Sequence, residues 1–128
     1  MFVKDTAKSN YFIAADNTHL CELLHPTRES LNLPYSVAHA IIKPGERSRS
    51  HRLKTSSEAY FILEGEGEMH VNEEQVHVGP GQMILVPPSY WQHICNTGAI
   101  DLKFLCIVHP MWHADDEEMN NSGGTQSR

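Results

Sequence analysis

The expected fold of this chain is decided by residues 45–67, GERSRSHRLKTSSEAYFILEGEG. A polar loop in this stretch carries His51 and leads to Glu58, an alternating apolar run follows, and two glycines end it. Alternation with a period of two is typical of a strand that buries one face. The stretch therefore predicts a strand, a turn and a strand, with an imidazole and a carboxylate facing one cavity.

Short apolar segments separated by turn residues continue along the rest of the chain. We expect strands at residues 11–14, 19–25, 36–42, 48–53, 58–64, 68–71, 75–78, 83–86, 91–96 and 102–109. One helical turn fits at residues 28–31, and Asn72 begins a good two-residue hairpin turn. About ten short strands without a convincing helix predict an all-β barrel or jelly roll.

The length of 128 residues predicts one domain with a real core. Residues 1–10 are polar and are interpreted as an N-terminal arm, followed by a β-barrel over residues 11–114. From residue 115 the sequence DDEEMNNSGGTQSR has clustered acid and no apolar periodicity. Such a composition cannot bury enough apolar surface to order itself, so residues 115–128 are predicted to be a disordered acidic tail.

Charge, cysteine content and hydropathy restrict the location and the partners. No window reaches the roughly 18 to 20 apolar residues of a membrane span, and no signal peptide is visible, so we expect a cytoplasmic protein without membrane partners. The net charge of −6 argues against nucleic-acid binding. An odd number of cysteines without a CxxC pair predicts reduced thiols packed like small apolar groups. Apolar residues on both faces of residues 19–25 predict a homodimer contact or a closed sheet edge.

A second motif, GQMILVPPSYWQHICN, occupies residues 81–96. Both stretches match the two motifs of the cupin superfamily in register. The matching residues are Gly45, His51, Glu58 and Gly65 in the first stretch and Gly81, Pro87 and Asn96 in the second. The chain thus resembles a small single-domain cupin of the Cupin_2, mannose-6-phosphate isomerase-like type. The resemblance implies a cupin-type double-stranded β-helix, or jelly-roll barrel.

The resemblance also implies a metal cage of three histidines and one glutamate inside the barrel. Two of these positions hold Leu53 and Gln92 here, so the implied ligands are His51, Glu58 and Gln92. Among Mn, Fe, Ni and Zn, such an oxygen-rich set favours Mn or Fe. If Gln92 faces inward, strand alternation turns His93 outward, whereas a bulge just before them would reverse this.

Two residues are candidates for proton transfer. Glu58 and Tyr60 share one strand face, so both are predicted to line the cavity. The structural alternatives are an ion pair of Glu58 with Arg49 or Arg52 and core packing of Tyr60.

Other polar residues show no motif spacing. Structural or surface roles are favoured for His39, His70, His77, His109 and His113. A basic cluster near the first motif, which could attract anions, consists of Lys43, Arg47, Arg49, Arg52 and Lys54.

Two functions are compatible with these features. The first is a metal-dependent cupin enzyme of isomerase, lyase, decarboxylase or dioxygenase type acting on a small polar, anionic metabolite. The alternative is a non-catalytic cupin that binds a small ligand through a degenerate metal site.

Overall fold

The computed structural model describes residues 1–120, and eleven short strands form its framework. The strands are β1 (Phe12–Ile13), β2 (His19–Leu24), β3 (Ser36–Ile42), β4 (His51–Leu53), β5 (Ser57–Glu64), β6 (Gly67–Val71), β7 (Glu74–Val78), β8 (Met83–Val86), β9 (Gln92–Asn96), β10 (Leu102–His109) and β11 (Glu117–Met119). The helical segments are η1 (Thr6–Lys8), α1 (Pro26–Glu29) and η2 (Ala114–Asp116). None of the helices among these residues is long and apolar enough to cross a membrane.

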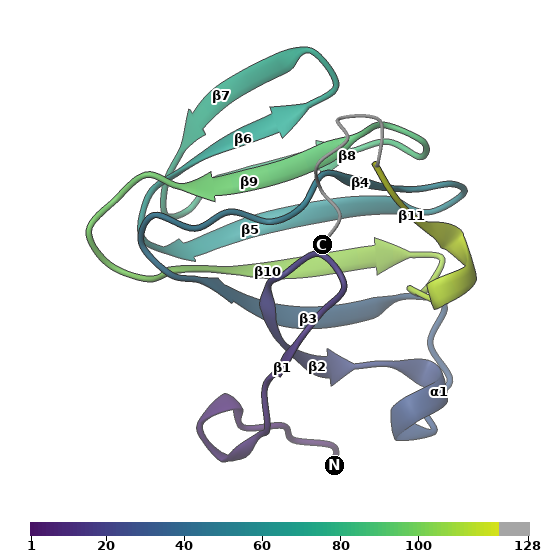
Figure 1. Cartoon of the computed structure of the whole chain (residues 1–128). Coiled ribbons are helices and arrows are strands. Elements are labelled where there is room, and N and C mark those ends of the chain that lie inside the picture. Colours follow the sequence, from purple (N-terminus) through teal and green to yellow (C-terminus); the bar gives the residue numbers. More distant parts are fainter. Residues whose placement is uncertain (121–128) are drawn as a thin grey trace.

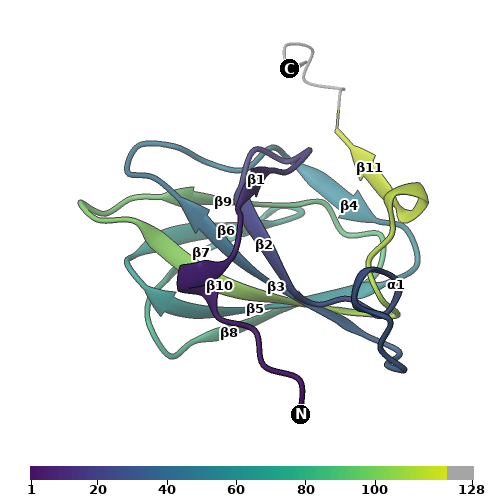
Figure 2. The same cartoon turned by 90° about the horizontal axis from the view of Figure 1, so that it is seen from below.

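The strands form two antiparallel sheets that face each other (Figure 1). One sheet has the order β1-β2-β3-β10-β5-β8 and the other the order β11-β4-β9-β6-β7. In two views, α1 and β11 lie at the same end of the barrel (Figures 1 and 2). This arrangement confirms the predicted all-β, double-stranded β-helix fold.

The core lies between the sheets because the strands alternate buried and less buried residues. In β3 the pattern is strictly alternating, and β10 alternates over its first seven residues. The largest fully buried apolar side chains, Phe104, Ile62, Met69, Ile94 and Leu102, come from both sheets. The period of two that predicted the strands therefore also predicted which faces meet.

Gly65 shows why the first motif closes with a glycine. Its φ of +83° lies in the left-handed region, which glycine adopts at little cost. A Cβ atom there would lie 2.6 Å from the backbone oxygen of Asp101. Any side chain would therefore displace the loop that precedes β10.

The prediction of disorder from residue 115 is wrong for residues 115–120. Asp116 is buried, and β11 pairs with β4 from Glu117 opposite Leu53 to Met119 opposite His51. The carboxylate of Asp116 accepts hydrogen bonds from the Thr55 backbone and hydroxyl and from the Ser56 backbone, at 2.9, 2.7 and 3.1 Å. Amino-acid composition does not predict this order, because the hydrogen bonds that order the segment come from residues far away in the sequence. Residues 121–128 lie outside the described part of the chain.

Two predicted elements differ from the structure by more than one residue at an end. The strand expected at residues 48–53 is shorter, because the backbone N–H of Arg49 donates to Asp16 in the β1–β2 turn. The helical turn expected at residues 28–31 begins earlier, at Pro26. Proline suits the first helical position because its missing N–H would have no partner there.

Candidate functional site

A cavity of about 330 Å³ is lined in part by residues of α1 and β11. Both sheets and the β1–β2 segment contribute to its wall. Most of the lining is apolar, and the charged or titratable groups on it include Asp16, Glu22, Arg28, His51, Glu58 and Glu117. Such a mixture of apolar wall and few convergent polar groups is typical of a small-molecule site.

His51 lies on β4 and is 2% exposed. Its Nδ1 lies 2.9 Å from the carbonyl oxygen of Arg49, which can only accept, so Nδ1 carries a proton. Its Nε2 lies 3.8 Å from Oδ2 of Asp16. Burial disfavours the charged ring, but the charges of Asp16 and Glu58 outweigh it and raise the pKa of His51. The ring is therefore held in one orientation and readily holds a second proton.

Glu58 reaches the same cavity from β5, on the opposite sheet, and is also buried. Burial raises the pKa of its carboxyl to about 7, although the nearby His51 opposes the shift. The alternative of an ion pair with Arg52 is not realised, because Arg52 binds Glu118 at 2.9 Å. At neutral pH the Glu58 carboxyl thus exists in both protonation states.

Gln92 faces the interior, as the strand register predicts, and is 1% exposed. It is the ladder partner of His51 between β9 and β4, but its side chain is not part of the cavity lining. The Gln92 amide oxygen accepts a hydrogen bond from the hydroxyl of Tyr60. Tyr60 in turn stacks on Phe104, with ring centroids 5.2 Å apart. Tyr60 therefore packs in the core beside the cavity, and its role in proton transfer stays a prediction.

The arrangement of these donors does not fit the metal that the cupin resemblance implies. Among residues 1–120, no three histidine, cysteine or acidic ligand atoms of this cavity lie within 4.8 Å of one another. Leu53, buried on β4, offers only hydrocarbon, and the amide oxygen of Gln92 already binds Tyr60. Metal binding by His51, Glu58 and Gln92 stays a prediction that this geometry does not support.

Among the cavity carboxylates that the sequence prediction missed are Asp16 and Glu117. Asp16 lies in the β1–β2 turn, where its Oδ1 accepts bonds from the Thr18 backbone and hydroxyl at 3.1 and 2.8 Å. These bonds orient the other carboxylate oxygen toward His51. Glu117 lies on β11, and burial raises its pKa. Both lie outside the two motifs, so no spacing signal could have found them.

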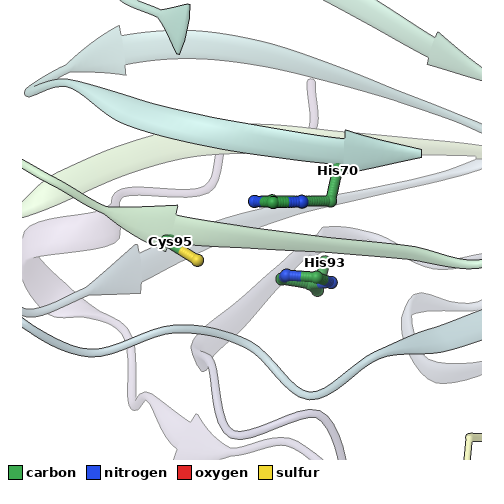
Figure 3. A group of neighbouring side chains, drawn as sticks. All are labelled: His70, His93 and Cys95. Carbon is green, nitrogen blue, oxygen red and sulfur yellow. The ribbon is translucent and has the colours of Figure 1, made fainter. Parts of the chain in front are cut away.

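A second group of titratable residues lies on the outer face of the β4-β9-β6 sheet. His70 of β6 and His93 and Cys95 of β9 each place one ligand atom within 4.8 Å of the others, and all three are half-buried (Figure 3). The two imidazole rings stack with centroids 4.2 Å apart. Burial and the neighbouring His70 lower the pKa of His93 to about 4. The sequence predicts a structural or surface role for His70, which shows no motif spacing, and a reduced, packed thiol for Cys95, which belongs to no CxxC pair.

The two facing sheets around an internal cavity define a double-stranded β-helix protein. The model of the Cupin_2 family, described as "Cupin domain", matches residues 38–108. The chain therefore belongs to the Cupin_2 family.

Two proteins with known sequences are similar to this chain. An uncharacterised protein of Methanocaldococcus jannaschii is 36% identical over 108 residues, which are 84% of this chain and 86% of that protein. An oxalate-binding protein of Thermotoga maritima is 33% identical over 67 residues, or 52% of this chain and 55% of that protein.

Solved structures share the fold at lower identity. A predicted oxalate decarboxylase from Thermotoga maritima has a TM-score of 0.76 at 22% identity and covers 85% of this chain and 99% of its own. The nucleoside dehydratase Pac13 has a TM-score of 0.75 at 19% identity and covers 94% of this chain and 91% of its own. Variants of Streptomyces Pac13 with uridine are similar to the same degree. Small cupins of this shape thus include enzymes.

Proposed function

We propose that this protein is a small-molecule enzyme in which Glu58 and His51 transfer protons to and from a substrate held in the cavity. The observation that carries the proposal is their placement. A buried carboxyl from one sheet and an oriented imidazole from the other line the same cavity of about 330 Å³. Paired titratable groups with shifted pKa values in a cavity are typical of acid–base sites.

The two groups suit opposite roles in one reaction. Glu58, with its pKa of about 7, can accept a proton from a carbon next to a carbonyl group. His51, with its raised pKa, can donate a proton to the substrate oxygen that gains negative charge or leaves as water. The proton gained by Glu58 and the proton lost by His51 balance in an isomerisation. In an elimination they leave an unsaturated product and one water molecule.

The charges on the cavity wall favour an uncharged or cationic substrate. Four carboxylates (Asp16, Glu22, Glu58 and Glu117) line the cavity, whereas its cationic groups are Arg28 and the protonated form of His51. None of the five lysines and arginines of the predicted basic cluster lines it. This charge balance favours such a substrate over the anionic metabolite that the sequence analysis expects.

The volume and the apolar wall restrict the size of the substrate. About 330 Å³ is at the lower end of the range for ligand pockets, roughly 300 to 1,000 Å³. Phe12 and Trp112 on the wall offer aromatic surface to a ring. A sugar, a nucleoside or a small hydroxy-carbonyl compound has suitable dimensions and polarity.

The proposal is tested by incubating the chelator-treated protein in deuterium oxide with sets of such compounds. We expect proton NMR to show deuterium incorporation or conversion for at least one of them, and Glu58→Gln to lose it while ligand shifts persist. Activity that vanishes with chelator and returns with Mn or Fe would contradict the proposal and favour a metal at His51, Glu58 and Gln92.

A second candidate is a non-catalytic binding protein. Leu53 and Gln92, at positions where the cupin resemblance implies histidines, support it, as does the similarity to an oxalate-binding protein. In this case the wild-type protein binds a compound of the set without converting it.

The homodimer that the apolar faces of residues 19–25 suggest stays a prediction.

A further inference from the structure

The outer face of the β6–β9 pair carries four polar side chains in a two-by-two array. In the ladder His70 is opposite His93, and Glu68 is opposite Cys95. Each strand contributes residues two positions apart, which therefore lie on one face. The interior sides of the same strands hold apolar and amide groups such as Met69, Ile94 and Gln92. This array is separated from the cavity by the sheet itself.

The donor atoms of the array are already close together. The ligand atoms of His70, His93 and Cys95 lie within 4.8 Å of one another. A tetrahedral Zn²⁺ with bonds of roughly 2.0 to 2.3 Å needs ligand atoms about 3.3 to 3.8 Å apart. Rotation about the side-chain bonds, with loss of the ring stacking, supplies the remaining approach of about 1 Å. Among residues 1–120, this is the one group of three such donors that meets the distance limit.

We propose that His70, His93 and Cys95 bind a borderline-soft divalent cation, Zn²⁺ in particular, on the outer face of the barrel. Two imidazoles and a thiolate are the ligand types that such ions prefer over water and carboxylates. The three residues are half-buried, so an ion can enter from solvent without unfolding the sheet. The bound ion links β6 to β9.

Glu68 supports the proposed site through a hydrogen bond to one of its ligands. Its Oε1 lies 2.9 Å from Nε2 of His70, where it accepts the ring proton and fixes the ring. Metal-binding histidines commonly donate their other ring N–H to a carboxylate in this way. Burial raises the pKa of the Cys95 thiol, and Arg47, whose backbone forms an isolated bridge with Cys95, opposes that shift. The fourth metal position is left to water.

Cobalt titration of the full chain tests the site, after chelator treatment and in a non-thiol reductant. Because Co²⁺ occupies Zn²⁺ sites, we expect one ion per chain with a near-ultraviolet sulfur-to-cobalt absorption band. Cys95→Ser abolishes the band, and His93→Ala weakens binding at least tenfold. Glu68→Gln weakens cobalt binding by about tenfold, which is a usual effect of removing a residue that hydrogen-bonds to a metal ligand. Zn²⁺ competes with the cobalt.

Matched variants separate this site from the cavity. His77, an exposed histidine on the neighbouring strand β7, serves as the control, and His77→Ala keeps the band and the affinity. His51→Asn, in the cavity, also keeps them. The proposal is overturned if the wild-type protein shows no band, if the band survives Cys95→Ser, or if His51→Asn removes the binding and His93→Ala does not. Circular dichroism confirms that each variant is folded.

Discussion

The two faces of strand β9 carry different chemistry. Gln92, Ile94 and Asn96 are buried on the inner face, whereas His93 and Cys95 lie half-buried on the outer one. The amide of Gln92 belongs to the core network with Tyr60, and the outer pair joins a cluster of metal-ligand types. The difference teaches that a histidine next to a motif position cannot replace it, because strand alternation sends it to the other face.

The largest expected effect is on catalytic activity, and it separates the cavity inside the barrel from the cluster on the outer face. On the substrate that the deuterium experiment identifies, Glu58→Gln lowers kcat by about 10² to 10⁴-fold, because it removes a proton-transfer group without changing its shape. Cys95→Ser, on the outer face, leaves kcat unchanged. Steady-state kinetics on both variants check this, and an equal loss in both would break the distinction between the faces.

The pH dependence of stability gives a second test of the contrast between the cavity and the outer cluster, because the Glu58 carboxyl in the cavity is buried. The pKa of Glu58 rises from 4.5 to about 7 on folding, so the native state holds the proton more tightly. The free energy of unfolding therefore falls as pH rises from about 4.5 to about 7 and is fully reduced above that range. At about 1.4 kcal/mol per pKa unit, the loss is on the order of 3 kcal/mol.

Urea denaturation at several pH values measures this dependence. Glu58→Gln has no carboxyl to ionise, so its profile is flatter and its stability exceeds that of the wild type at pH 8. The raised pKa of His51 acts in the same direction, because its contribution is complete below pH 6.5 and is lost as pH rises through the folded value. Parallel profiles for the variant and the wild type would contradict the assignment to Glu58.

The cavity, unlike the outer cluster, depends on the strand that follows Asp116. Asp116→Ala removes a carboxylate that accepts three hydrogen bonds from Thr55 and Ser56, and it leaves the buried backbone N–H of Ser56 without its acceptor. We expect the free energy of unfolding to fall by about 2 to 3 kcal/mol. Ligand binding in the cavity weakens because β11 carries part of its wall, whereas cobalt binding outside persists. Thermal denaturation and both titrations check this.

Asp116 also gives a pH signature of its own. Burial alone raises the pKa of its carboxyl, but the bonds from Thr55 and Ser56 outweigh it and the pKa is lowered. This stabilisation is present above the unfolded pKa near 3.8 and disappears as pH falls through the lower folded value. The acid unfolding of Asp116→Ala therefore lacks this component, and Glu118→Gln, which changes an exposed carboxylate, retains it.

Local patterns explain which features the sequence revealed. The strands were predictable because alternation is local, and the inward direction of Gln92 followed from parity along β9. His51 and Glu58 were found because both belong to the first motif of the cupin resemblance. Asp16 joins them only through the β1–β2 turn packing on Arg49, which no local pattern records. His70 meets His93 through the β6–β9 register, and that pairing is decided by the whole fold.

A smaller effect concerns the inner residue Gln92. Gln92→Ala leaves the hydroxyl of Tyr60 without its acceptor and opens a small void, because Gln92 is 1% exposed. We expect a loss of about 2 kcal/mol in the free energy of unfolding. Tyr60→Phe also leaves a buried partner unpaired, and the double variant loses less than the sum of the two. Double-mutant denaturation curves measure the coupling, and additive losses would show that the two groups do not interact.

The smallest effect is expected one residue further along the same strand. His93→Ala removes a ring stacked on His70 at a cross-strand pair, which is worth about 0.2 to 1 kcal/mol in a metal-free protein. The loss is smaller than for Gln92→Ala because His93 is half-buried and leaves no enclosed void. With Zn²⁺ present the difference in Tm between the wild type and His93→Ala becomes larger, because Zn²⁺ binding to the native state raises the Tm of the wild type but not that of the variant. Melting curves with and without Zn²⁺ measure both differences. If Gln92→Ala instead abolished the Zn²⁺ shift and His93→Ala kept it, the metal would lie on the inner face and the contrast between the two faces would be reversed.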